Sequence, residues 1–297
     1  MLIRLINNLR FVLNHPFNKG RLLSTLKRYM GWQISSRLAP GPIIVPWVNG
    51  AKLIARHGET GVTGNVYCGL HEFEDMAFLL HALRPDELFV DIGANSGSYT
   101  MLACAALDGR GLSIEPVPAT FERLRMNIGL NGLGKKVRAL NIGLADKAGF
   151  LYFSSSQDTT NHVVVDAGGS EDTIRVEIKI LDEIIHGEFP SVIKVDAEGY
   201  ELPILRGATA VLSNPELHSV ILELNGSGAR YGHDEGEVTR LMAEFGFGIY
   251  SYDPRERELS VLAAPNKEGN TLFVRDRARV GRLVADAPVF SLFGRQW

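Results

Sequence analysis

Residues 88–116 read LFVDIGANSGSYTMLACAALDGRGLSIEP, and this stretch decides the fold. The apolar run Leu88–Val90 is short enough to be a buried parallel strand. Gly93 and Gly97 follow it, where they let the backbone turn tightly and approach a ligand, and residues 98–106 read as a helix. A strand, a glycine-rich turn and a helix in this order are typical of the first unit of a nucleoside-binding α/β domain.

Two carboxylates flank the turn. Asp91 closes the first strand, and Glu115 follows a second strand that ends at Ile114, where a carboxylate can accept hydrogen bonds from two ribose hydroxyls. The dinucleotide fingerprint Gly-x-Gly-x-x-Gly has a middle glycine that the loop from Gly93 to Gly97 lacks. The loop therefore fits a nucleoside such as S-adenosylmethionine better than NAD, and a turn that binds nothing is the alternative.

The overall composition is that of a folded globular protein. Its 297 residues, of which 45% are hydrophobic and 22% charged, allow one large domain or one domain with an appendage. Cys68 and Cys104 are too few for a disulfide framework, which favours a reducing compartment. Charged residues interrupt the apolar N-terminus, and no run reaches the roughly eighteen apolar residues of a membrane span. We therefore expect a cytoplasmic protein, either soluble or membrane-peripheral.

Charge is distributed unevenly along the chain. Residues 1–58 contain nine Lys and Arg and no Asp or Glu, a charge of +9 against −12 for residues 59–297. Apolar residues recur at helical spacing in 2–13 and 22–30, which predicts two short basic amphipathic helices. Residues 1–38 could contact an anionic membrane, face an anionic glycan, or pack on their own domain or a second subunit with the charges solvated, which is the simplest interpretation. Nucleic acid is not expected, because no helix-turn-helix, RNA-recognition or zinc-ligand pattern accompanies the charge.

We therefore divide the chain into a basic arm, residues 1–58, and a cofactor-binding domain, residues 59–297. The end of the arm reads as a β-hairpin, because two apolar segments flank Asn49-Gly50, a two-residue signal for a primed turn. Residues 67–83 carry apolar side chains on one helical face, which predicts a helix. Glu72 lies near its start, where a carboxylate could reach the ammonium end of a cofactor or serve only as a first-turn acid.

Strand and helix signals alternate after residue 116, and this rhythm predicts a parallel sheet. Residues 137–144 form the third predicted strand, whose Asn141 and Leu144 would border an adenine ring in such a fold. A pair of inserted strands follows, around the polar loop 154–162. His162 is the candidate general base of this loop, because its proton affinity lies near neutral pH.

Carboxylates gather at the ends of two later strands. Asp196 and Glu198 follow the fourth strand, residues 191–195, and Glu223 ends the fifth. Because ligands in open α/β sheets bind at the carboxyl ends of strands, these acids are candidates for orienting or deprotonating a substrate. We expect no metal, and Asp196 with Glu198 is the one pair through which a metal could act. The chain ends in three antiparallel strands, which predicts a mostly parallel sheet with a C-terminal antiparallel hairpin.

Four blocks, in this order and at these spacings, carry a family resemblance: DIGANSGSYT (91–100), IEPVPATFERLRMNIGLN (114–131), IKVDAEGYELPILRGA (193–208) and ILELNG (221–226). They resemble the FkbM family of S-adenosylmethionine-dependent methyltransferases, over roughly residues 69–274. The resemblance implies a class I methyltransferase fold, Rossmann-like, with a seven-stranded sheet. It also implies methyl transfer, usually to a hydroxyl oxygen, on saccharides or secondary metabolites, with many relatives in polysaccharide biosynthesis. The basic arm lies outside it.

The resemblance also assigns residues to the site. Matched residue by residue, it implies a cofactor loop, a ribose-binding acid and an acidic block formed by Asp91, Gly93, Asn95 and Gly97, by Glu115, and by Asp196 with Glu198. The full set of candidate cofactor-binding residues is Glu72, Asp91, Gly93, Ala94, Asn95, Gly97, Ser98, Tyr99, Thr100, Glu115, Pro116, Asn141, Leu144, Asp196 and Glu198. The candidate catalytic residues, in order of preference, are Asp196, His162 and Glu223.

The sequence therefore predicts an S-adenosylmethionine-dependent O-methyltransferase that acts on a small-molecule or glycan acceptor, and it leaves room for a homo-oligomer. Two alternatives use the same fold. An NAD-linked oxidoreductase is disfavoured by the missing middle glycine. A non-catalytic nucleoside-binding module is disfavoured by the acids that follow the fourth strand.

Overall fold

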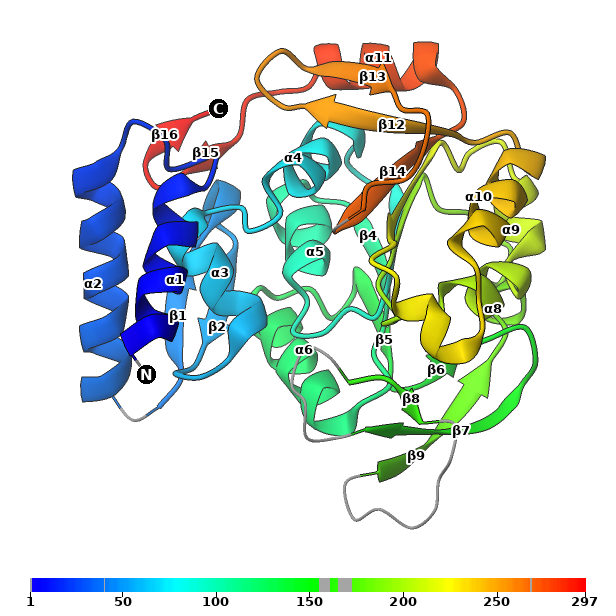
Figure 1. The fold of residues 1–297 in the computed structure, drawn as a ribbon, viewed down its shortest axis with the longest axis horizontal. Helices are drawn as coiled ribbons and strands as arrows, with labels where there is room; N and C mark the ends of the chain where they lie inside the picture. Colours follow the sequence, from blue (N-terminus) through cyan, green and yellow to red (C-terminus); the bar gives the residue numbers. More distant parts are fainter. Residues whose placement is uncertain (1, 40, 155–160, 165–172, 268) are drawn as a thin grey trace.

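A central sheet with helices on both faces dominates the structure, a computed structural model that describes residues 2–39, 41–154, 161–164, 173–267 and 269–297. Among these residues, eight strands form the sheet in the order β13-β12-β14-β11-β10-β3-β4-β5 (Figure 1). The mutually parallel strands are β3 (Leu88–Ile92), β4 (Arg110–Ile114), β5 (Val137–Leu140), β10 (Val192–Val195) and β11 (Ser219–Glu223). Strand β14 (Asn270–Val274) pairs antiparallel with both β11 and β12 (Gly248–Asp253), so β12 runs in the direction of the parallel strands, and β13 (Glu258–Val261) pairs antiparallel with β12. The expected α/β sheet with antiparallel C-terminal strands is confirmed, and β13 extends its edge.

Each face of the sheet packs against its own set of helices. Strand β3 shows why, because Phe89 points into one core while Leu88 and Val90 point into the other. The first core is covered by α4 (Phe73–Ala82), α5 (Ser98–Met101) with its π-turn η2 (Leu102–Ala106), α6 (Pro118–Leu130) and α11 (Arg277–Ala285). The second is covered by α7 (Leu181–Ile184), α8 (Glu201–Arg206), α9 (Thr209–Ser213) and α10 (Glu235–Glu244).

The N-terminal arm packs against the domain. It comprises α1 (Leu2–Asn14), α2 (Leu22–Leu38), and a hairpin of β1 (Ile43–Pro46) and β2 (Lys52–Ala55) that turns through η1 (Val48–Gly50). Both helices lie at one margin of the molecule (Figure 1). Trp47 donates its indole N–H to the Gly69 carbonyl at 2.5 Å, and Asn127 of α6 accepts from the Ile54 backbone N–H at 2.8 Å. The domain boundary after residue 58 stays a prediction, with β2 before it and α3 (Thr60–Cys68) after it.

Two predicted elements are divided in the structure. The single helix predicted over 67–83 is wrong, because Gly69 has φ +83 and ends α3, and the chain restarts as α4 at Phe73. The single strand predicted over 137–144 is wrong at its end. Strand β5 ends at Leu140, and β6 (Gly143–Leu144) pairs instead with the inserted strands.

The inserted strands form a second, four-stranded sheet in the order β6-β9-β7-β8. Strands β7 (Gly149–Ser154) and β9 (Thr173–Lys179) are the predicted antiparallel pair, and β8 (Val163–Val164) extends them. Of the polar loop 154–162, only residues 154, 161 and 162 lie within the described residues. The remaining elements are η4 (Ser227–Tyr231) and a C-terminal hairpin of β15 (Ser291–Leu292) and β16 (Arg295–Gln296). No helix in the described part of the chain is long and apolar enough to cross a bilayer.

The ends of β3 and β10 approach each other closely. Asp196 donates its backbone N–H to the Ile92 carbonyl at 3.0 Å, and Gly93 donates to the Ile114 carbonyl at 2.9 Å. Gly93 has φ +75, and a Cβ added there would lie 1.8 Å from the carbonyl oxygen of Asp196. Glycine is therefore required at position 93 both for its backbone conformation and for the space that Asp196 occupies.

Gly93→Ala should lower the free energy of unfolding by at least about 2 kcal/mol, because it combines a left-handed alanine with a backbone clash. Gly129→Ala is the matched control, since this glycine lies within α6 with no atom within 4 Å of an added Cβ. The free energy of unfolding of this control should rise by about 0.5 kcal/mol, because alanine has a higher helix propensity than glycine. Urea unfolding measures both, and equal stabilities of the two variants would contradict the close approach.

Candidate active site

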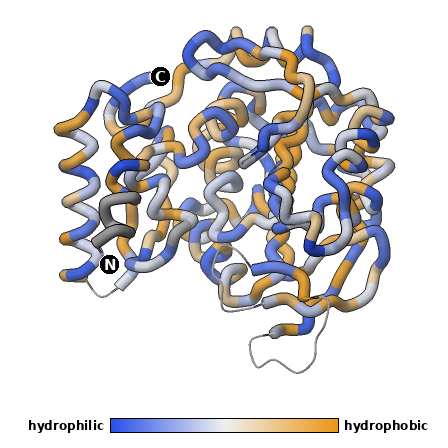
Figure 2. The backbone as a smooth tube through the Cα atoms, viewed as in Figure 1, coloured by the Kyte–Doolittle hydropathy of each residue, from blue (hydrophilic) through white to orange (hydrophobic). Residues whose placement is uncertain are grey.

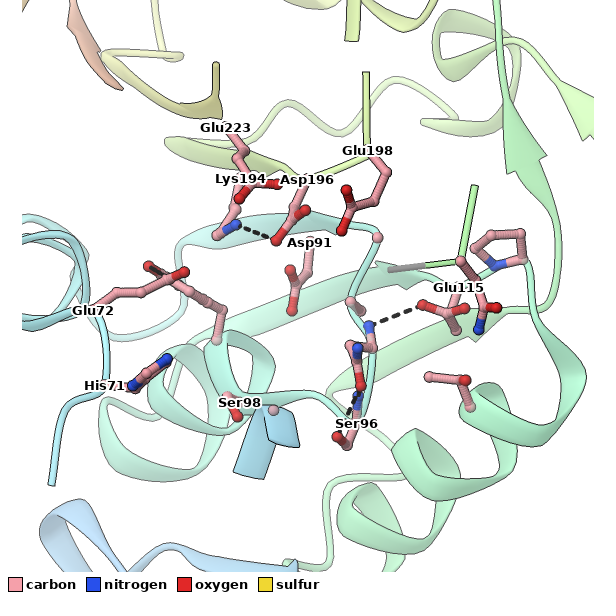
Figure 3. Close-up of a pocket in the computed structure, with 18 of the residues that line it drawn as sticks. His71, Glu72, Asp91, Ser96, Ser98, Glu115, Lys194, Asp196, Glu198 and Glu223 are labelled. Carbon is pink, nitrogen blue, oxygen red and sulfur yellow. Dashed lines mark hydrogen bonds and ion pairs between the residues drawn. The ribbon is translucent and has the colours of Figure 1, made fainter. Parts of the chain in front are cut away.

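A cavity of about 330 Å³ opens at the carboxyl ends of β3, β4, β10 and β11 (Figure 3). The predicted site residues that line it are Glu72, Asp91, Gly93, Ala94, Asn95, Ser98, Tyr99, Glu115, Pro116, Asp196, Glu198 and Glu223. Those that do not are Gly97, Thr100, Asn141, Leu144 and His162. The loop after β3 and the acids that end three neighbouring strands therefore share one cavity.

Glu115 ties the cofactor loop to the end of β4. Its carboxylate accepts from the backbone N–H groups of Asn95 and Val117, both at 2.9 Å. Asn95 holds the left-handed conformation, φ 50, that turns its N–H toward this carboxylate. Burial raises the pKa of Glu115 to about 7, although these two hydrogen bonds favour the charged form and lower the pKa. A carboxylate has about four acceptor positions, so Glu115 can bind two further hydroxyl groups while it holds the loop.

Asp91 stabilises the loop from within. Its carboxylate accepts from the backbone N–H of Thr100 at 3.0 Å and from the Thr100 hydroxyl at 2.6 Å. Burial raises the pKa of Asp91 to about 6, although both bonds favour the charged form. Gly97, with φ +88, begins α5. Thr100 and Gly97 therefore shape the loop from behind the cavity.

Glu72 and Tyr99 form one side wall. The Tyr99 hydroxyl donates to the Glu72 carboxylate at 2.5 Å, and both residues line the cavity. Figure 3 shows Glu72 at this side of the cavity. Glu72 immediately precedes α4, so its carboxylate lies near the N-terminus of that helix. Neighbouring His71 also lines the cavity, and burial lowers its pKa.

A buried ion pair lies at the end of β10. Lys194 donates from Nζ to Oδ2 of Asp196 at 2.9 Å, and the lysine side chain is 3% exposed. Its ammonium group also lies 5.0 Å from the centre of the Tyr99 ring. Burial disfavours the ammonium ion, but Asp196 and Glu72 outweigh burial and raise the pKa of Lys194. Burial likewise opposes ionisation of Asp196, and Lys194 outweighs it, so the pKa of Asp196 is lowered.

Two further carboxyl groups surround Asp196. Oxygen atoms of Asp196, Glu198 and Glu223 lie within 4.8 Å of one another. Burial, followed by the charge of Asp196, raises the pKa of Glu223 to about 9 and that of Glu198 to about 7. Glu223 is hydrogen-bonded to Asp196. At neutral pH, Asp196 is therefore ionised between the ammonium group of Lys194 and the protonated carboxyl group of Glu223.

The turn after β10 aims Glu198 at the cavity. Glu198 has φ 51, a conformation that costs a non-glycine residue about 1–2 kcal/mol. Glu201 supports this turn, because its carboxylate accepts from the backbone N–H groups of Ala197 at 3.0 Å and Gly199 at 3.1 Å. Glu201 therefore shapes the turn, and Glu198 presents its carboxylate to the cavity (Figure 3).

Besides Gly97 and Thr100, three predicted residues lie outside the lining. Asn141 donates to the backbone carbonyls of Glu115 at 2.8 Å and Pro116 at 3.0 Å, so it holds the end of β4. Leu144 is buried in the core below the cavity. The backbone N–H of His162 donates to the Ser154 hydroxyl at 3.0 Å, and its neighbour Asn161 reaches the lining instead.

The sequence did not single out several lining residues, namely Gly61, His71, Met76, Ser96 and Thr120. His71 and Met76 come from the segment around Glu72, and Thr120 comes from the first turn of α6. The sequence could have indicated Thr120 as a lining residue, because Thr120 lies five positions after the predicted ribose-binding acid, at a predicted helix start. No local pattern distinguished Gly61.

Glu223→Gln should change how stability depends on pH. The folded pKa of Glu223, about 9, lies above its ordinary value of 4.5, so its contribution to stability is complete below pH 4.5 and is lost as pH rises through 9. Because a glutamine cannot ionise, the free energy of unfolding of the variant, relative to that of the wild type, should rise by about 2 kcal/mol between pH 5 and pH 9. This value is reduced because the side chain is partly exposed to solvent.

Urea unfolding at several pH values measures this difference. Glu122→Gln is the control, because the Glu122 side chain is 60% exposed and pairs with Arg125 at the surface. The control should parallel the wild type. A Glu223→Gln curve that also parallels the wild type from pH 5 to 9 would contradict the protonated state of Glu223.

Comparison with known proteins identifies the family. The family model described as Methyltransferase FkbM domain matches residues 91–249, more than half of the chain. Hexuronic acid methyltransferase AglP of Haloferax volcanii is 30% identical over 178 residues, which cover 58% of this chain and 68% of that protein. Methyltransferase sdnD of Sordaria araneosa is 27% identical over 169 residues, which cover 46% of this chain and 65% of that one.

Among solved structures, a putative transferase, PH0793 of Pyrococcus horikoshii, is similar with a TM-score of 0.45 and 16% identity, over 85% of this chain and 84% of that one. The expected class I arrangement is present in the structure itself, where β14 is inserted antiparallel between β11 and β12. The matched segment contains the cofactor loop, the ribose acid and the acidic block. The chain therefore belongs to the FkbM methyltransferase family, and its methyl donor is S-adenosylmethionine.

Proposed function

We propose that the chain transfers the methyl group of S-adenosylmethionine to a hydroxyl oxygen of a saccharide or a secondary metabolite. The observation that carries the proposal is the position of Asp196. Its backbone lies against Gly93 of the cofactor loop, and its carboxylate lines the same cavity. A hydroxyl group bound by this carboxylate would therefore lie beside the cofactor. The family assignment also disfavours the NAD-linked oxidoreductase.

The transfer is an in-line displacement. The acceptor oxygen forms a bond to the methyl carbon, the bond from that carbon to sulfur breaks with its electron pair going to sulfur, and the hydroxyl proton leaves. Because the sulfonium is already activated, holding oxygen and methyl within about 3–3.5 Å supplies much of the acceleration. The cavity's task is to position the acceptor and to accept its proton.

Asp196 is the first candidate for this task, because it is ionised at neutral pH and can accept a hydrogen bond from the acceptor hydroxyl. Glu223 is a weaker candidate, since its pKa of about 9 leaves it protonated. His162 is also weaker, because it lies outside the cavity lining. As the proton leaves, Lys194 keeps Asp196 in place through their 2.9 Å contact.

The charges of the cavity favour an uncharged acceptor. The described lining residues include carboxyl groups from Glu72, Asp91, Glu115, Asp196, Glu198 and Glu223, whereas Lys194 is the one permanently cationic side chain among them. Such a lining attracts the positively charged sulfonium of the cofactor and repels an anionic acceptor. AglP is named for a hexuronic acid. We infer that this chain instead takes the hydroxyl group of a neutral small molecule or glycan.

We also propose a binding partner for the basic arm. Residues 1–58 contain no acid and nine cationic side chains, which supports contact between residues 1–38 and an anionic membrane. A homo-oligomer formed through the arm is the alternative.

Mass spectrometry of native extracts, incubated with the protein and methyl-labelled S-adenosylmethionine, should reveal a labelled acceptor with an ether methyl group. Asp196→Asn should then lower kcat for this acceptor by about 10²–10⁴-fold, the usual contribution of a positioned proton acceptor. Asp108→Asn is the control, because that side chain is 73% exposed and lies at the opposite end of β4. Unchanged turnover by Asp196→Asn would remove Asp196 from the mechanism.

Glu115→Gln should weaken S-adenosylhomocysteine binding by about tenfold or more. An amide offers fewer acceptor positions for the ribose hydroxyls than a carboxylate does, and its NH2 group cannot accept a hydrogen bond from the Asn95 N–H. Isothermal titration measures the affinity, with exposed Glu122→Gln as the control. NAD should give no binding to the wild type. Equal affinity of the Glu115 variant and the wild type would contradict the assigned role of Glu115.

A further inference from the structure

Helix α2 has apolar side chains on two opposite faces. Its buried face packs against the domain through residues that include Tyr29 and Trp32, which are 3% and 6% exposed. On the outer face are Leu23, Met30, Ile34 and Leu38, which are 84%, 52%, 53% and 78% exposed. We call these four residues the outer stripe. Surface helices of globular proteins normally carry polar residues on the outer face, so the outer stripe needs an explanation.

The stripe follows one side of the helix. With about 100° of rotation per residue, its four residues fall within an arc of about 80°, and Trp32 points the opposite way. Helix α2 lies at the outer margin of the molecule, and hydrophobic segments recur along its length (Figures 1 and 2). The outer stripe therefore runs along one side of most of α2, with Lys27 between Leu23 and Met30.

Cations accompany the stripe. Lys27 and Arg37 are exposed and lie about 20° and about 60° from the centre of the stripe, by the same helical geometry. Lys19 is exposed in the turn before α2, and Arg10 is exposed on α1. No acid occurs before Glu59 to neutralise them. An apolar stripe that is accompanied by cations, in an arm without acids, complements an anionic lipid surface, where apolar groups enter the headgroup boundary and cations bind the lipid charges.

A second copy of this chain fits the same surface less well. A two-fold interface through the stripe would bring Lys27 and Arg37 of both copies into one interface, with no acid in residues 1–58 to separate them. The apolar area could be buried in such a dimer, but like charges would oppose it.

The geometry points to α2 as a membrane-docking helix: its outer stripe inserts into the headgroup boundary of an anionic membrane while Lys27 and Arg37 bind lipid phosphates. This inference rests on the membrane contact proposed above and names the surface that makes it. It is independent of methyl transfer, because none of these residues lines the cavity.

Sedimentation of the full chain with vesicles tests the docking. The wild type should bind vesicles of equal parts phosphatidylcholine and phosphatidylglycerol, should not bind phosphatidylcholine alone, and should be released by high salt. Met30→Gln/Ile34→Gln should weaken partitioning at least tenfold. Lys27→Gln/Arg37→Gln should weaken it about 30-fold, since each cation near an anionic leaflet contributes about fivefold.

Val261→Gln/Val289→Gln is the matched control, because these residues are 65% and 55% exposed outside the arm. It should bind vesicles like the wild type. Thermal unfolding and S-adenosylhomocysteine titration should be unchanged in every variant, which separates docking from folding and from the catalytic site.

Three results would overturn the inference. If the wild type fails to bind anionic vesicles at low salt, the membrane contact itself is wrong. If it binds and the outer-stripe variants bind equally well, another surface makes the contact. If light scattering shows a dimer that Met30→Gln/Ile34→Gln dissociates, the stripe is a subunit interface. Methyl transfer can persist in all three cases, so failure of the docking and failure of the enzymatic proposal are distinguishable.

Discussion

The contact between the ends of β3 and β10 is the constraint on which the site depends. The carbonyl oxygen of Asp196 occupies the space that a Cβ at Gly93 would need, so the cofactor loop and the acidic turn lie against each other. Gly93 and Ala94 also donate to the Ile114 carbonyl at the end of β4, which brings Glu115 to the same edge. Three strand ends are thereby held at one place, and the cavity forms between them.

The second constraint is electrostatic. The described lining contains many more carboxyl groups than cations, and burial raises the pKa of several of them, Glu115 and Glu198 to about 7. Lys194 allows Asp196 to remain charged in these surroundings. A sulfonium cofactor adds positive charge where the protein supplies little. In the function that we propose, the same lining disfavours an anionic acceptor, so one distribution of charge selects both the cofactor and the substrate.

The sequence predicted the cofactor loop and the acids after β4, β10 and β11, because each follows an apolar run whose end is readable from local pattern. Predictions from the sequence were wrong where contacts between distant segments determine the structure. Helix 67–83 is interrupted at Gly69, a residue that periodicity alone does not mark as a stop. Asn141 and Leu144 lie behind the cavity because the chain leaves the main sheet after β5 to join the second one. His71 and Thr120 reach the cavity only through packing of α4 and α6.

One proton is held beside Asp196 at neutral pH, because Asp196 is ionised next to Lys194 and Glu223 is protonated. Carbon-13 NMR of the glutamate side-chain carboxyl groups, with the Glu223 signal assigned by comparison with Glu223→Gln, measures this directly. Glu223 should titrate with a pKa of about 9 in the wild type and with a pKa closer to its ordinary value in Asp196→Asn. A Glu223 signal that titrates near 4.5 in the wild type would contradict it.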